Sequence, residues 1–173
     1  MLDVADQSVL EALLDSWDRN NTIMLNLLRA VPEGGLEASA TRDSPSVAQQ
    51  FTHMHYERLI SVFEEAPEFA LAVPEDKWGL ESDKKRLAQM LDESAKAVRD
   101  AVKGRVEAGR NMDLNYDHPV LLLQLLLWHE GYHHGQIKLA LKLAGHPIRD
   151  EEAGPFTWDV WRRKRSEPAT ILE

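Results

Sequence analysis

Apolar residues recur along most of the chain at the three- and four-residue spacing of amphipathic helices. No stretch alternates between apolar and polar residues as a half-buried strand does. The pattern predicts an all-α fold in which one domain, residues 1–173, forms a four-helix bundle. The four long helices are expected at about residues 10–31, 45–65, 87–109 and 119–144.

Local signals set the expected helix boundaries. Ser44 and Pro45 indicate an N-cap followed by proline in the first turn, and Asp117 is expected to cap the fourth helix just before its proline. Gly145 predicts where that helix stops. In the first helix, Asn20 and Asn21 are weak helix formers, so a slight irregularity is expected there.

The last third of the chain carries the most apolar segment. Residues 120–128 are apolar nearly all round, which is typical of the most buried helix of a bundle. After a polar linker, residues 156–161 predict one short amphipathic helix laid against the bundle. Trp158 and Trp161 are expected to cover the core, with a substrate pocket as the alternative place for them.

Composition excludes several classes of function. The formal net charge of −9 argues against a nucleic-acid or anionic-membrane partner, because phosphates attract basic surfaces. With no cysteine in the chain, disulfides, thiolate metal sites and a cysteine nucleophile are excluded, and any thiol must come with the substrate. The acidic N-terminal residues do not resemble a signal peptide, and no apolar run is long enough to span a membrane. We therefore expect a cytoplasmic protein.

The candidate chemistry lies in the fourth helix, where His129 and His133 are four residues apart on one face. An unsatisfied imidazole buried there would cost roughly 1–3 kcal/mol, whereas two imidazoles can share one divalent ion. Zinc and nickel both suit such ligands. The second helix offers either His53 or His55 as a third ligand, and periodicity places His55 nearer the centre of its apolar face. A buried hydrogen-bonded network without metal is the alternative.

Two further motifs overlap this pair. Residues 129–133 read HExxH, the pattern of zinc peptidases, in which Glu130 would act as the general base. Gly131 weakens that helix, and no predicted strand is present to align a peptide, so Glu130 is alternatively a base or a supporting partner in a bundle site. Gln136 lies on the same side of the helix as His133 and can orient a ligand or a bound water. A di-iron site is discarded, because no second ExxH is present.

Residues 50–59 and 129–137, with 143–147 and 158–161 further on, resemble the DinB-like family of metal-binding four-helix bundles. The resemblance implies an up-down-down-up bundle and a metal held by His53, His129 and His133. It selects His53 over His55 because an apolar residue lies two positions before it and another follows it. The family often has arginine where this chain has His134.

The function implied by the resemblance is a metal-dependent transferase or hydrolase acting on a small molecule, with a low-molecular-weight thiol as a candidate cosubstrate. A non-catalytic metal-binding or interaction bundle is the alternative, and a zinc peptidase is a weaker one. The fourth helix is apolar around most of its circumference, and this feature, together with the resemblance, also favours a homodimer.

Overall fold

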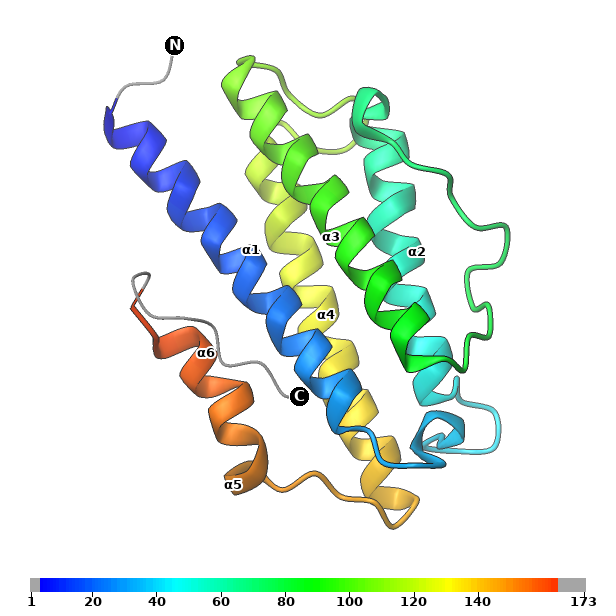
Figure 1. The fold of residues 1–173 in the computed structure, drawn as a ribbon. Helices are drawn as coiled ribbons and strands as arrows, with labels where there is room; N and C mark the ends of the chain where they lie inside the picture. The colour runs from blue at the N-terminus through cyan, green and yellow to red at the C-terminus, as the bar shows by residue number, and fades with distance from the viewer. Residues whose placement is uncertain (1–3, 165–173) are drawn as a thin grey trace.

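The computed structural model describes residues 4–164, and all regular structure within that range is helical. Four long helices form the body of the molecule, and short helical segments occupy the connections and the C-terminal part (Figure 1). The predicted all-α fold is confirmed. The long helices are α1 (Val4–Ala30), α2 (Val47–Glu65), α3 (Lys84–Glu107) and α4 (Pro119–Leu143). The short segments are η1 (Gly35–Glu37), η2 (Pro67–Phe69), α5 (Asp150–Ala153), η3 (Gly154–Phe156) and α6 (Trp158–Arg162).

The helices follow the predicted up-down-down-up order (Figure 1). α2 returns antiparallel to α1 after the short η1 connection. The long segment between η2 and α3 then runs back along the outside of the bundle, so that α3 is parallel to α2. α4 runs antiparallel to both, and α6 lies beside α1. In this arrangement α2 contacts both α3 and α4. Its histidines can therefore point toward either of these two helices.

Two clusters of buried hydrophobic residues make up the core. One includes Leu28, Phe51 and Leu87, and the other includes Trp17 and Leu122; all five are buried to 2% exposure or less. Burying a side chain of this size contributes about 1.5–3 kcal/mol, so these clusters supply most of the driving force for folding.

Asn20 and Asn21 do not interrupt α1, contrary to the expected irregularity. Both side chains are buried and satisfied by tertiary hydrogen bonds. Asn20 Nδ2 donates to Glu130 Oε2 at 2.6 Å, and Asn21 Nδ2 donates to Asp92 Oδ1 at 2.8 Å. These contacts remove the competition between the amide side chains and the local backbone that makes asparagine a weak helix former.

Two of the three predicted boundary residues are wrong by one or two positions. α2 is capped by Ser46 rather than Ser44: the Ser46 hydroxyl accepts from Gln49 N, and the Gln49 side chain accepts from Ser46 N, which makes a capping box. α4 is capped by the His118 ring instead of Asp117. The predicted stop at Gly145 agrees with the structure, since this residue adopts φ 84° just after α4.

The predicted burial of α4 and of the C-terminal tryptophans is also wrong. One face of α4 is open to solvent, with Leu125 41%, Trp128 72% and Tyr132 56% exposed. Trp158 and Trp161 are 60% and 42% exposed, because the buried residue of α6 is Val160. In place of one C-terminal helix, the chain forms α5, η3 and α6. No helix within residues 4–164 combines the length and hydropathy needed to cross a membrane.

Candidate metal centre

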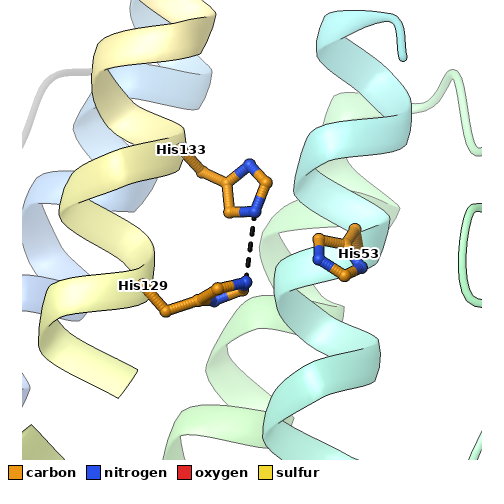
Figure 2. Close-up of side chains that lie close together, drawn as sticks. All are labelled: His53, His129 and His133. Atoms are coloured by element: carbon orange, nitrogen blue, oxygen red, sulfur yellow. Dashed lines mark hydrogen bonds between the residues drawn. The ribbon is translucent and has the colours of Figure 1, made fainter. Parts of the chain in front are cut away.

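Three histidines from two helices converge in the bundle. His53 projects from α2, while His129 and His133 project from α4, and the three rings face one another across the space between the helices (Figure 2). One ligand nitrogen from each ring lies within 4.8 Å of the other two. His53 and His133 are buried, and His129 is half-buried. Of the three rings, that of His129 is therefore the most exposed to solvent.

The two histidines of α4 point their Nε2 atoms at each other. These atoms are 3.2 Å apart, as the four-residue spacing of a helix allows (Figure 2). Two nitrogens that each bind zinc at 2.0–2.1 Å in tetrahedral geometry are separated by about 3.3–3.4 Å. The pair is thus already close to the separation that a shared metal requires.

His53 is held by the segment that follows η2. The ring of Trp78 stacks on the His53 imidazole with 3.9 Å between ring centroids and 19° between planes. On the α2 side, His53 Nδ1 lies 3.8 Å from Glu57 Oε1, and Glu57 pairs with Lys77 at 2.9 Å. Trp78, Lys77 and Glu57 were not identified as site residues from the sequence. Nothing in helical periodicity indicates which side chain of an irregular segment will cover a site.

Burial keeps all three imidazoles neutral. It lowers the pKa of His53 to about 4 and that of His133 to about 3, in the second case with help from His129 and His53. It also lowers the pKa of His129, although Glu57 and Glu130 oppose the change. A neutral imidazole has the free lone pair that a metal ligand needs, so no proton has to be displaced near neutral pH.

His55, the alternative third ligand, points elsewhere. Its Nδ1 lies 2.7 Å from the carbonyl oxygen of Met90 on α3. The ring is buried between α2 and α3 and is not part of the three-histidine group. The structure therefore brings His53, and not His55, to the pair on α4.

Glu130 is fully buried, and its carboxylate is occupied by other protein groups. Arg58 Nε donates to Oε1 at 2.6 Å and Arg58 Nη2 donates to Oε2 at 2.8 Å, while Asn20 Nδ2 donates to Oε2. The general base of an HExxH site must present its carboxylate to a water at the metal. Glu130 has 0% exposure and both its oxygens already accept hydrogen bonds, so the structure gives the peptidase interpretation no support.

Two amides adjoin His133. Gln136, predicted from its position on α4, forms a side-chain hydrogen bond with His133 that raises the pKa of the imidazole and so opposes burial. Gln50 on α2 was missed: its Oε1 lies 3.4 Å from His133 Nδ1. When Nδ1 donates to Gln50, Nε2 keeps its lone pair toward His129. The spacing of Gln50 and His53, one helical turn apart, is the sequence signal that could have identified it.

The donor set fits a divalent metal ion. His53 Nδ1 is buried and, within residues 4–164, has no hydrogen-bond partner. Buried polar atoms without partners are rare in folded proteins unless a ligand or water satisfies the group. Three histidine nitrogens are also a common ligand set of catalytic zinc, which keeps a fourth position for water or substrate.

Comparisons with known proteins identify the family. The sequence model of the DinB family matches residues 1–150, a range that includes α2, α4 and all three clustered histidines. No curated protein and no solved structure matches the chain. The match covers most of the 173 residues, and the chain therefore belongs to the DinB family.

Proposed function

We propose that this protein is a metal-dependent enzyme that holds one divalent ion, zinc or nickel, through His53, His129 and His133. The proposed reaction is a transfer or hydrolysis on a small molecule, with a low-molecular-weight thiol as cosubstrate. The observation that carries the proposal is the convergence of three neutral, mostly buried imidazoles with their ligand nitrogens within 4.8 Å of one another.

The residues around the three histidines have distinct proposed roles. A divalent ion at this site supplies Lewis acidity, which lowers the pKa of a bound water or thiol. Gln50 holds the tautomer of His133, and Gln136 orients a ligand beside the same ring. Trp78 limits the access of water to His53 and restricts its ring. Glu130, through Arg58 and Asn20, keeps the adjoining turn of α4 in position and is a positioning residue in this proposal.

The thiol and its location follow from the chemistry of the chain. No cysteine is present, so a sulfur nucleophile has to arrive with the cosubstrate. A free thiol stays reduced in the cytoplasm, and we place the enzyme there. The net charge of −9 supports a small-molecule substrate in preference to nucleic acid or an anionic membrane.

Metal analysis tests the central claim. We expect the purified parent to take up one equivalent of zinc or nickel after dialysis against the metal, and the His133→Ala variant to take up none. The matched control is His146→Ala, which removes an exposed imidazole outside the cluster. Equal metal content in parent and His133→Ala would refute the site.

Cobalt substitution separates the enzyme from a metal-binding module without catalysis. A three-histidine site with an open position should change its visible spectrum when a small thiol such as cysteamine or 2-mercaptoethanol is added. The burial of His53 and His133 is the observation that favours the non-catalytic alternative, because metal sites that are closed to solvent and substrate usually have a structural role. An unchanged spectrum with every thiol and with azide would favour that alternative.

We also propose that two copies pair through the exposed face of α4. On this face Leu125, Trp128 and Tyr132 are exposed, and a Cβ added at the nearby Gly131 or Gly135 would meet no atom within 4 Å apart from the local backbone of α4 and the adjoining residues. The spacing of three and four residues is that of a helix seam, and glycines allow two helices to approach closely. Because the seam bears no charge, two acidic copies do not repel each other along it.

Sedimentation equilibrium tests this pairing. Leu125→Glu should convert a dimer to a monomer, whereas Leu114→Glu, at a 69% exposed leucine in the loop before α4, should leave the dimer intact. A parent that sediments as a monomer at concentrations up to about 100 μM contradicts the proposal, because a dimer that forms only above this concentration is too weak to be of use.

A further inference from the structure

A cavity lies beside the C-terminal half of α4. It has a volume of about 360 Å³, within the range of small-molecule sites, and it is a partly open cavity lined by α1, the C-terminal half of α4 and the segment from residue 146 to 157. None of the three clustered histidines lines it. The part of its wall formed by residues 152–157 lies beyond the range matched by the family model.

The cavity walls are mainly apolar. They come from segments far apart in the sequence, which the fold brings together around one space. The apolar lining residues are Leu27, Ala30, Pro32, Ile148, Ala153 and Phe156. A molecule that fills this space must therefore have an apolar body.

Two polar groups on one face of α4 also line the cavity. His134 and Lys138 are four residues apart, so their side chains project from the same side of the helix. His134 Nε2 is buried and has no hydrogen-bond partner among the described residues. Lys138 Nζ pairs at 2.7 Å with Asp150, a carboxylate that is 84% exposed. Because an exposed ion pair adds little stability, another carboxylate can replace Asp150 at low cost.

The other titratable groups at the cavity do not provide a competing anchor. Glu152 is exposed, and its Oε2 accepts from the backbone N of Arg149 at 3.3 Å, where it serves the first turn of α5. His146 is exposed in the connection after α4. Among the titratable groups that line the cavity, one imidazole and one ammonium thus remain to hold a single anionic head group.

We propose that this cavity binds a small monocarboxylic acid with an apolar body, its carboxylate held by Lys138 and His134. The hydrocarbon part lies against the apolar walls, and the carboxylate accepts hydrogen bonds from Nζ of Lys138 and Nε2–H of His134. The site is separate from the metal centre and does not depend on the proposed function.

Isothermal titration of the full chain with octanoate tests the proposal, with 1-octanol as the neutral probe of the same body. We expect one octanoate per chain, and at least about tenfold weaker binding of octanol, since a hydrogen bond to a charged group is worth more than one to a neutral group. Lys138→Gln should weaken octanoate to the level of octanol. Lys142→Gln, one turn further along the same helix and not lining the cavity, is the matched control.

Two variants fill the cavity from different elements. Ala30→Phe acts from α1 and Ala153→Leu from α5, and either should abolish octanoate binding. α5 lies outside the four long helices, so Ala153→Leu remains informative if Ala30→Phe fails to fold. Titrations of metal-loaded and metal-free protein should agree, which separates this site from carboxylate binding at the metal.

Four results would overturn the proposal: no octanoate binding by the parent, equal binding of octanoate and octanol, full binding by both filling variants, or binding that requires the metal.

Discussion

Arg58 and Glu130 form a two-point ion pair with no solvent exposure on either side chain. The guanidinium also donates to the Leu91 carbonyl and to Asn21 Oδ1, and it lies over the Trp17 ring at 4.9 Å. One pair thereby ties α2 and α4 to α1 and α3. Because its charges are desolvated, the pair stabilises the fold only while both members are present.

Replacing Glu130 with Gln should destabilise the protein by about 3–5 kcal/mol, because it leaves the Arg58 charge buried without a counter-charge. Urea unfolding followed by circular dichroism measures the loss. The double variant Arg58→Met with Glu130→Leu removes both charges and should recover much of that stability. A stability close to that of the parent in Glu130→Gln would contradict the structural role and return Glu130 to the candidates for a base.

Exchanging either His53 or His55 for alanine should give opposite results. His53→Ala removes a member of the three-histidine group and should abolish stoichiometric metal binding. His55→Ala removes only the contact with the Met90 carbonyl, so it should lose about 1 kcal/mol of stability and keep the metal. Elemental analysis of the metal content of each variant measures the difference. Metal loss in His55→Ala but not in His53→Ala would show that His55, and not His53, is the third ligand.

Gln50→Met should weaken metal binding by about 10–100-fold without removing a ligand, since groups that orient a ligating imidazole contribute on this scale. The reason is the contact of Gln50 Oε1 with His133 Nδ1, which keeps the proton on Nδ1 and leaves the lone pair of Nε2 available to the metal. Competition with a chromophoric chelator measures the affinity. The exposed Gln89→Met serves as the control, and equal affinities in the two variants would show that Gln50 does not orient His133.

The metal-free protein should lose stability as the pH falls below about 6.5. The pKa of His53 is lowered to about 4 and that of His133 to about 3, from an ordinary value of 6.5. Between these limits the unfolded chain binds protons that the folded chain does not, so the free energy of unfolding decreases by about 1.4 kcal/mol per pH unit for each site. Above 6.5 both states are neutral and the contribution is fully retained.

Urea midpoints measured between about pH 7.5 and 5 test this dependence, in a range where most carboxylates stay ionised. The double variant His53→Ala with His133→Ala should show a flatter profile. A metal-free parent whose stability is constant over that range would mean that the imidazoles are not desolvated as the structure indicates.

The sequence by itself determined the fold class and the pair on α4. Helical periodicity extends over most of the chain, and local signals such as Gly145 place helix ends to within a few residues. His129 and His133 share a face because a helix repeats every 3.6 residues, whatever it packs against. Such features depend on neighbours in the chain and can therefore be read from it.

Only the tertiary structure decided which faces meet. α2 packs against both α3 and α4, so it has two buried faces, and periodicity cannot tell that His55 meets α3 while His53 meets α4. The same limitation explains why the sequence left Glu130 as either a base or a supporting partner, and why α4 was expected to be the most buried helix of the bundle. Each of these outcomes depends on the rotation of a helix relative to partners far away in the sequence, and long-range packing, which no local pattern encodes, sets that rotation.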